Sequence, residues 1–253
     1  MSALTLKNVG MRYGDTVVLE RLNLILDSGT FCAVVGASGA GKSTFLKLLL
    51  SELQPTEGSI TLGGRPLPQE PGPERGVVYQ RYSVFPHLTA LENICFGLER
   101  TEGSALFGRT WGAKRRALRT EARDLLEAVG LTAAADRFPG ALSGGMQQRL
   151  ALAQTLALKP ELLLLDEPFG ALDPGNKQAA HALLQALWAE RGMTVVMVTH
   201  DLSEAFTLGT RVLVLDKVRE DPHSPERFGA SITYDLPVDR SAPPGAASLP
   251  PVS

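Results

Sequence analysis

The most informative residues of this chain form a glycine-rich loop that ends in a lysine and two hydroxyl residues. The loop consists of Gly36, Ala37, Ser38, Gly39, Ala40, Gly41, Lys42, Ser43 and Thr44. Glycines at this spacing let the backbone curl so that successive N–H groups point at an anion, and Lys42 adds a positive charge for the β- and γ-phosphates of a nucleotide. The hydroxyl of Ser43 is a ligand for Mg²⁺. The loop therefore predicts a site for a nucleoside triphosphate, such as ATP, with Mg²⁺.

The residues on either side of the loop supply the two elements that such a site needs. The apolar run Phe31 to Val35 predicts a buried strand. Residues from Ser43 to about Leu50 predict a helix whose N-terminal dipole faces the phosphates. A glycine-rich loop that binds nothing is the alternative, but it does not account for the order of strand, loop and helix.

The composition is that of an ordinary globular protein with a slight negative charge. The chain has 253 residues, of which 44% are hydrophobic and 21% charged, and its net charge is −2. This charge argues against whole-surface attraction to nucleic acid, so we expect no nucleic-acid partner. The longest apolar runs are far shorter than the ~20 residues of a membrane helix, and residues 1–9 alternate in polarity. We therefore expect neither a membrane span nor an export signal, and a cytoplasmic location.

Periodicity predicts a parallel α/β core, preceded by an antiparallel β subdomain and interrupted by a helical subdomain. Segments 4–9 and 22–26 alternate apolar and polar residues, as half-buried antiparallel strands do. Residues from about 86 to 160 have helical patterns, and short apolar strands follow at 162–165 and 194–198.

The apolar residues of one predicted helix fall on a single face that ends before Gly130. They are Leu118, Ala122, Leu125, Leu126 and Val129. We expect one domain over residues 1–216 with the helical subdomain at about 86–160. An extension over 217–240 has one alternating segment around Tyr234, and the proline-rich residues 241–253 are expected to be disordered.

A second glycine-containing string covers residues 142–149 and reads LSGGMQQR. It resembles the signature motif of ABC ATPases, and the other motifs follow in the family's order across about residues 4–216. The resemblance implies a P-loop NTPase core of ABC type that binds and hydrolyses ATP. Ser143, Gly144, Gly145 and Gln147 would then serve the γ-phosphate of an ATP held by a second copy, in a head-to-tail dimer with two ATPs at the interface. The alternative, a serine N-cap after a glycine-rich turn, explains only the helix start.

The apolar strand 162–165 delivers two acids, Asp166 and Glu167, beside the phosphate loop. It resembles the Walker B strand, which implies that Asp166 binds Mg²⁺ and that Glu167 activates the attacking water. The resemblance also assigns Gln80 to the Q-loop glutamine that senses Mg²⁺ and the γ-phosphate. His200, which follows the strand 194–198, matches the switch histidine that contacts the γ-phosphate. The expected catalytic set is Glu167, His200, Gln80 and Lys42, and the expected Mg²⁺ ligands are Ser43, Gln80 and Asp166.

Two further residues match the family but have local alternatives. Asp173 matches the D-loop aspartate of the nucleotide site, and before Pro174 it is also a good helix N-cap. Tyr13 matches the aromatic residue that stacks on adenine, while an aromatic residue of the core or of a turn is its rival.

The segment from 82 to 94 resembles the ATPases of bacterial nitrate, sulfonate and taurine type importers. Strings at 169–175, 205–210 and 232–235 are similar to the branch associated with urea carboxylase operons. The resemblance implies a transmembrane permease and a solute-binding protein as partners, and a peripheral place on the inner face of the plasma membrane. Transport of urea, guanidine or a related small nitrogen compound is a hypothesis. Residues 101–113 depart from the shorter importers of this type.

Two other functions share the core motifs. One is the motor of an ABC exporter; the other is a soluble ABC protein acting on ribosomes or nucleic acid, which usually has a second ATPase domain or a long coiled-coil insertion. A basic cluster within the helical subdomain is either a solvated helix face or a contact with the permease or anionic lipid. The cluster consists of Arg109, Lys114, Arg115, Arg116 and Arg119.

Overall fold

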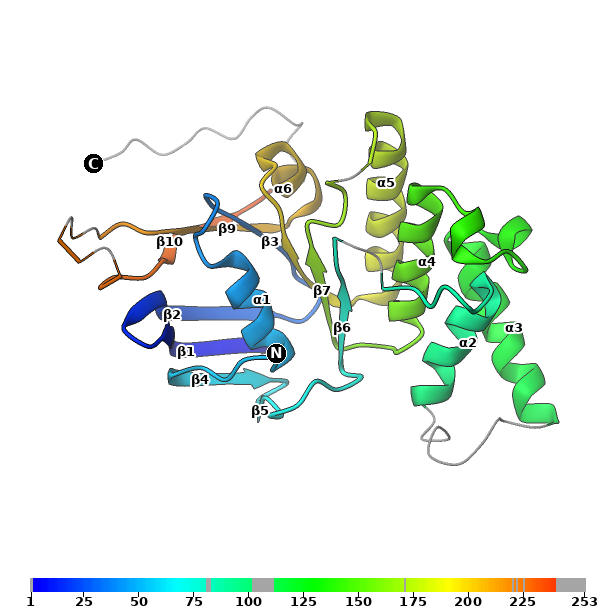
Figure 1. Cartoon of the computed structure of the whole chain (residues 1–253), viewed down its shortest axis with the longest axis horizontal. Coiled ribbons are helices and arrows are strands. Elements are labelled where there is room, and N and C mark those ends of the chain that lie inside the picture. The colour runs from blue at the N-terminus through cyan, green and yellow to red at the C-terminus, as the bar shows by residue number, and fades with distance from the viewer. Residues whose placement is uncertain are drawn as a thin grey trace.

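The computed structural model describes most of the chain, and the described residues are 2–80, 83–101, 112–170, 172–219, 221, 223–224 and 226–239. They form a lobe that contains two sheets and a second lobe of helices (Figure 1). Among the described helices, none is long and apolar enough to cross a membrane. Tyr82, Arg109 and the expected disordered tail at 241–253 lie outside the described residues.

The central sheet has six strands in the order β10-β9-β3-β8-β7-β6. Its strands are β6 (Arg75–Val78), β7 (Leu162–Asp166), β8 (Thr194–Val198), β3 (Phe31–Val35), β9 (Arg211–Asp216) and β10 (Ser231–Pro237). All neighbours from β9 to β6 run parallel, and β10 runs antiparallel to β9 at the edge. Every residue of β3 and β8 is buried, as expected for strands covered on both faces.

A smaller antiparallel sheet covers one face of the central sheet, with helix α1 between them (Figure 1). It contains β1 (Ser2–Tyr13), β2 (Thr16–Asp27), β4 (Glu57–Leu62) and β5 (Arg65–Pro66). Helix α1 (Lys42–Leu50) contacts β2, β7 and β8. Its buried leucines share one hydrophobic core with both sheets, which fixes the start of α1 beside the carboxyl end of β3.

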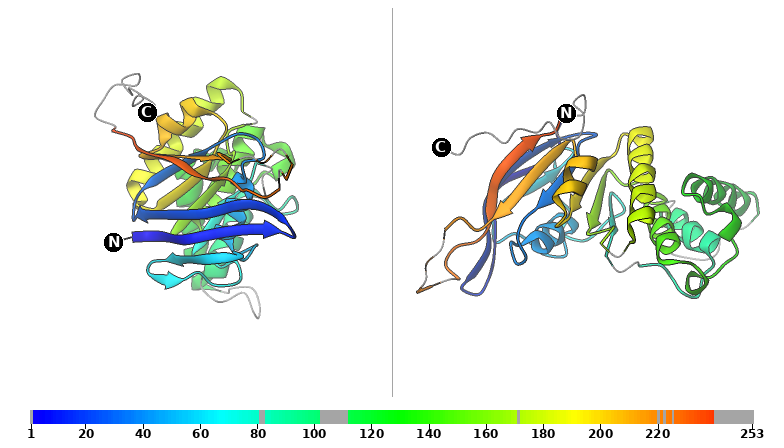
Figure 2. Two further views of the ribbon diagram at one scale, coloured as in Figure 1. Left: turned by 90° about the vertical axis from the view of Figure 1, so that its left-hand side faces the viewer. Right: turned by 90° about the horizontal axis from the view of Figure 1, so that it is seen from above.

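Helices α5 (Pro174–Arg191) and α6 (Leu202–Leu208) contribute to a second hydrophobic core, on the other face of the central sheet. Helices α2 (Ala90–Thr101), α3 (Ala113–Ala128) and α4 (Gly144–Leu156) form the helical lobe, beyond α5 in the view from above (Figure 2). Two short 3₁₀ turns, η2 (Thr132–Ala134) and η3 (Pro139–Ala141), connect α3 to α4. The face predicted for α3 is buried, and Gly130 has a left-handed φ of 69° just after the helix.

The predicted fold class, an α/β core with an antiparallel β subdomain and a helical insertion, is confirmed. Sequence patterns did not predict β4, β5, β6, β9, the bounds of α2, or α6. The alternating segment of the extension is β10, so residues 231–237 complete the central sheet. Strand β6 escaped prediction because its first residue is charged: Arg75 is buried, and its guanidinium donates to Ser51, to Glu74 and to the carbonyls of Leu49 and Glu70.

Candidate functional site

The glycine loop runs from the end of β3 into α1 and fits closely against its surroundings. A Cβ on Gly36 would lie 2.2 Å from the carbonyl oxygen of Leu215 in β9. Gly41 has a left-handed φ of 78°, and a Cβ there would lie 2.7 Å from the Leu19 side chain of β2. Both positions therefore require glycine, so the curled backbone with its N–H groups is fixed by packing. Residues 37–39 and Ser43 stay exposed.

The Lys42 side chain points into the curl of this loop. Its Nζ donates to the carbonyl oxygens of Gly36 at 2.7 Å and Ala37 at 2.8 Å. Across the sheet, the half-buried Asp166 carboxyl has a raised pKa because of burial, to which the charge of Glu167 adds, while Lys42 and Lys47 oppose the shift. Because β3, β8 and β7 are parallel neighbours, the loop after β3 and the acid at the end of β7 lie at the same edge of the sheet.

Glu167 adopts a backbone conformation that is unusual for a residue with a side chain. Its φ is 45°, in the left-handed region, which costs about 1–2 kcal/mol for a non-glycine residue. Its N–H donates to the Val198 carbonyl at 2.9 Å, and its own carbonyl accepts from Gly170 at 3.2 Å. The strained turn lets the chain leave β7 sharply and hold the carboxylate at the sheet edge. Such strain is typical of functional positions.

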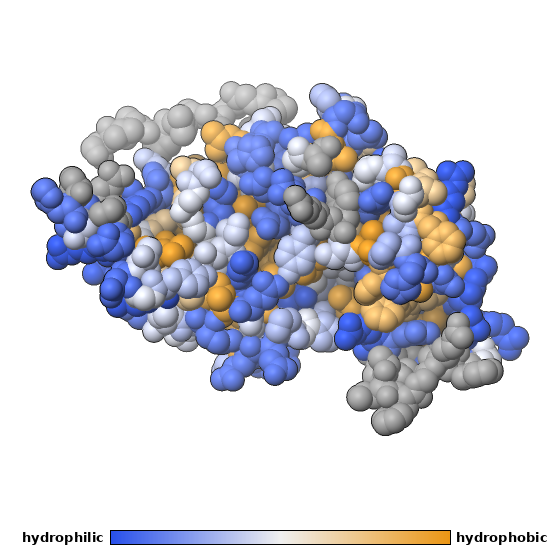
Figure 3. Space-filling view, viewed as in Figure 1, coloured by the Kyte–Doolittle hydropathy of each residue, from blue (hydrophilic) through white to orange (hydrophobic). Residues whose placement is uncertain are grey.

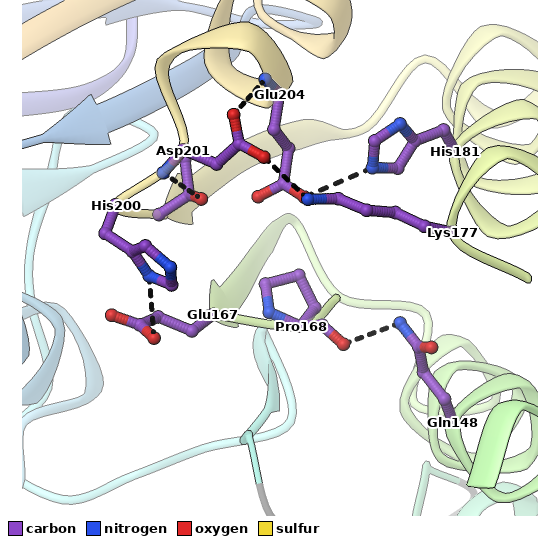
Figure 4. A network of polar contacts seen from close by, with 9 residues as sticks. Gln148, Glu167, Pro168, Lys177, His181, His200, Asp201 and Glu204 are labelled. Atoms are coloured by element: carbon purple, nitrogen blue, oxygen red, sulfur yellow. Dashed lines mark hydrogen bonds and ion pairs between the residues drawn. The ribbon is translucent and has the colours of Figure 1, made fainter. Parts of the chain in front are cut away.

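The two remaining predicted catalytic residues lie beside Glu167. His200 Nδ1 is 3.1 Å from Glu167 Oε2 (Figure 4). Gln80 follows β6 and is exposed. A Cβ on Gly170 would lie 3.8 Å from Gln80 Nε2 and 3.9 Å from Glu167 Oε2, so both side chains border Gly170. The structure therefore brings Lys42, Asp166, Glu167, Gln80 and His200 to one edge of the sheet.

The donor set fits Mg²⁺ better than a metal held by protein alone. No group of three or more His, Cys, Asp and Glu side chains among the described residues could hold a metal ion. Mg²⁺ in nucleotide sites takes one or two carboxylates, and phosphate oxygens and waters complete its shell. Ser43 and Asp166 would supply the hydroxyl and the carboxylate, with Gln80 beside them. When bound, Mg²⁺ would neutralise phosphate charge, and Glu167 would accept a proton from water.

The signature segment occupies the helical lobe. Ser143 caps α4, with its Oγ accepting from Met146 N–H at 3.3 Å, so the helix itself begins at Gly144. The Gln147 amide donates to the carbonyls of Pro139 at 3.0 Å and Leu142 at 3.2 Å, within the same lobe. In the described part of the chain, no hydrogen bond joins residues 143–147 to the phosphate loop.

The two residues with local alternatives have clear positions. Asp173 caps α5, as predicted: Oδ1 accepts from Asn176 N–H at 3.1 Å and Oδ2 from the Asn176 amide at 2.6 Å, which holds the pKa of Asp173 below its usual value. Its role in the nucleotide site stays a prediction. Tyr13 ends β1 before the turn to β2 and is 49% exposed, so the ring is free of the hydrophobic core and accessible for stacking.

Sequence reasoning missed a network of polar side chains behind this site. Its members are Gln148, Lys177, His181, Asp201 and Glu204 (Figure 4). Two patterns could have indicated it. Asp201 with Glu204 three residues later is a helix-capping pattern, and Lys177 with His181 is an i, i+4 pair on one helix face.

Comparison with known proteins decides the family. A family model described as ABC transporter matches residues 19–170. The chain belongs to the ABC transporter family. It is 41% identical to the bicarbonate transport ATP-binding protein CmpD of Synechocystis, over 94% of this chain and 81% of that relative. It is 38% identical to the sulfate/thiosulfate import ATP-binding protein CysA of Mycobacterium tuberculosis, over 94% of this chain and 64% of that relative.

Solved structures agree with the family. The dimeric ATP-binding cassette MJ0796, in a post-hydrolysis state bound to ADP and Pi, is 30% identical with a TM-score of 0.72, covering 93% of this chain and 99% of that one. The cbiO1 protein from Clostridium perfringens shows the same fold at 23% identity, with a TM-score of 0.76 over 92% of this chain and 88% of that one. The resemblance to importer-type ATP-binding subunits and the assignment as an ABC ATPase are confirmed.

We expect Glu167→Gln to bind ATP but to lose turnover, because an amide cannot accept the proton of the attacking water. General bases contribute about 10²–10⁴-fold, and kcat should fall by about that factor. Phosphate release at saturating ATP measures it, and gel filtration should show ATP holding the variant as a closed dimer. Glu161→Gln, at an exposed carboxylate before β7, is the matched control. Near-normal turnover of Glu167→Gln contradicts the assignment of the base.

Lys42→Ala should instead weaken nucleotide binding itself. The variant removes the charged donor inside the loop, and loss of such a hydrogen bond to an anion weakens binding by about ten- to a hundredfold. Titration with a fluorescent ATP analogue gives the dissociation constant. Lys7→Ala, on the exposed face of β1, controls for the loss of a lysine. Unchanged affinity in Lys42→Ala is incompatible with this loop being the phosphate site.

Proposed function

We propose that this chain is the ATP-hydrolysing motor of a bacterial importer and works as a pair bound to a permease at the inner face of the plasma membrane. The observation that carries this is the 41% identity to a bicarbonate transport protein over 94% of the chain. The catalytic set at the sheet edge supports it, because Lys42, Glu167 and His200 meet there. Import is favoured over export because the CysA relative is named for import.

Two copies are needed because the signature segment lies in another lobe from the phosphate loop. Ser143 and Gly144 start α4, which contacts α2, α3, α5 and β6, whereas α1 contacts β2, β7 and β8. A second copy facing the first head to tail would bring its signature to the ATP held by Lys42. In a dimer with two-fold symmetry, each copy would complete the ATP site of the other. The dimeric MJ0796 cassette supports this arrangement.

The permease would dock on the helical lobe beside Gln80. The Phe85 and Phe96 rings pack edge to face with centroids 4.7 Å apart, and both are half-buried. Apolar side chains gather on this lobe (Figure 3). A cavity of about 150 Å³ between α2 and α3 is lined by apolar side chains such as Phe96, by Arg115 and Arg119, and by Glu92 and Glu99. An amphipathic segment of the permease, with apolar side chains and charged side chains of both signs, fits such a surface.

Hydrogen bonds tie α2 to residues 85–89, which follow Gln80 in the sequence. Asn93 of α2 is fully buried; its Oδ1 accepts from Phe85 N–H at 2.8 Å and its Nδ2 donates to the carbonyls of Phe85, Leu88 and Thr89 at 2.9–3.1 Å. The segment 85–89 therefore moves with α2. A permease bound there would exchange motion with Gln80, five residues earlier, when ATP closes the dimer.

The transported solute is proposed to be small and polar. The two relatives are named for bicarbonate and for sulfate or thiosulfate, although this chain is nearly equally similar to both. Their names therefore do not select one solute, and a separate solute-binding protein would confer specificity. The similarity of segments 169–175 and 205–210 to the urea carboxylase branch makes urea and guanidine the first compounds to test.

Affinity purification of the tagged chain from native membranes in mild detergent tests this function. We expect a polytopic permease to co-purify, because the docking surface would bind it, and mass spectrometry would identify it. The reconstituted complex should take up a small polar solute and hydrolyse ATP faster in its presence, with bicarbonate, sulfate, urea and guanidine compared directly. Ribosomal or DNA-bound partners without a membrane protein contradict the importer function, and absence of uptake of urea and guanidine removes that substrate hypothesis.

A further inference from the structure

The first two turns of α5 carry a cation and an imidazole on one face, behind the catalytic edge. Lys177 and His181 are four residues apart, and both point toward Glu204 of α6 (Figure 4). Lys177 Nζ is 2.7 Å from Asp201 Oδ2 and 3.2 Å from Glu204 Oε1. The face therefore contacts the segment that directly follows His200.

Asp201 is fixed on three sides, which fixes its neighbour His200. Its Oδ2 accepts from Lys177, its Oδ1 accepts from Glu204 N–H at 3.2 Å, and its own N–H donates to Thr199 Oγ1 at 3.1 Å. The His200 side chain itself is exposed, and its Nδ1 contacts Glu167. The position of the switch histidine is therefore set by the residue after it.

The same helix face also contacts Phe169, which closely follows Glu167 in the chain. Glu204 has a side chain only 2% exposed, and its Oε1 lies 3.2 Å from His181 Nε2. The His181 ring packs at 72° on Phe169, with centroids 4.6 Å apart. Phe169 is two residues after Glu167, within the strained turn. Lys177 thus contacts Asp201, which follows His200, and His181 contacts Phe169, which follows Glu167 by two residues.

The start of α5 is also in contact with the signature segment. A Cβ on Gly145 would lie 3.7 Å from Asn176 and 3.8 Å from Leu172. In addition, the buried Gln148 of α4 donates to the Pro168 carbonyl at 2.7 Å, directly after Glu167. A shift of the start of α4 therefore reaches the catalytic edge through both α5 and Pro168.

We propose that Lys177 is a positioning residue for ATP hydrolysis: through Asp201 it holds His200 against Glu167, and so ties the start of α5 to the catalytic carboxylate. The inference rests on the roles proposed for Glu167 and His200. Lys177 does not touch the nucleotide in this scheme. Its loss should lower the catalytic rate and leave ATP affinity unchanged.

Steady-state ATPase assays on the purified full chain test this with Lys177→Met and Lys177→Arg. Misplacement of a catalytic group by about 1 Å costs up to about a hundredfold, so we expect kcat of Lys177→Met to fall by about ten- to a hundredfold with KM for ATP unchanged. Lys177→Arg, which can still pair with Asp201, should restore most of the rate. Lys159→Met removes a lysine–carboxylate pair of the same kind, with Glu121 at 2.8 Å, and should keep wild-type kcat.

Asp201→Asn provides a second route should Lys177→Met fail to fold. Asparagine keeps the helix cap but loses the charge that pairs with Lys177. If both residues act through one contact, the double variant should be no slower than the slower single variant. Any of three results would overturn the proposal. The first is an unchanged kcat in Lys177→Met or Asp201→Asn, and the second is additive losses of kcat in the double variant. The third is a loss of kcat in Lys177→Met that is not recovered in Lys177→Arg. Glu167→Gln is assayed in parallel. If Glu167→Gln keeps its turnover, the assignment of Glu167 as the base fails. If Glu167→Gln is inactive and Lys177→Met is fully active, only the role of Lys177 is refuted.

Discussion

The parallel pairing of β3, β8 and β7 is the constraint on which the rest of the structure depends. Phe31 pairs with Val195, and Leu163 with Val195 from the other side, so the three strands end at the same edge. A different group follows each strand at this edge: the phosphate loop after β3, Asp166 and Glu167 at the end of β7, and His200 after β8. No one segment holds the chemistry, and electrostatic stabilisation of phosphoryl transfer requires that all three be placed before the reaction starts.

The strained backbone of Glu167 is held by contacts with this sheet and with neighbouring elements. A left-handed glutamate is unfavourable by itself, and it persists because several elements hold it: the Val198 carbonyl, Gly170, His200, and Gln148 through Pro168. Those contacts come from β8, the switch segment and α4. The conformation of Glu167, the proposed general base, therefore depends on several separate elements, and movement of any of them would reach it.

Local patterns predicted a large part of the molecule. Strands 31–35 and 194–198 have the predicted bounds, Asp173 caps a helix as predicted, and Ser143 caps α4 as its local alternative had it, because apolar runs and caps are decided by neighbouring residues. Strand β6 was missed because its buried Arg75 is satisfied by distant partners, and Gly76 is needed where Thr155 of α4 crosses 2.5 Å from a Cβ. The φ of Glu167 and the pairing of Lys177 with Asp201 likewise arise from contacts between segments far apart in sequence. The proposed catalytic residues come from a family resemblance, because their spacing alone does not encode them.

The central claim is that each catalytic site is completed by a second copy of the chain. Mixing two inactive variants tests this most directly: Lys42→Ala, with a defective phosphate loop, and Ser143→Arg, with a defective signature. Every homodimer would lack a complete site, whereas each mixed dimer would contain one. At ATP concentrations too low to fill the site of Lys42→Ala, either variant alone should be nearly inactive and an equal mixture should recover ATPase activity, up to about a quarter of the wild-type rate if copies pair at random. A mixture as inactive as its components, or full activity of Ser143→Arg alone, would contradict it.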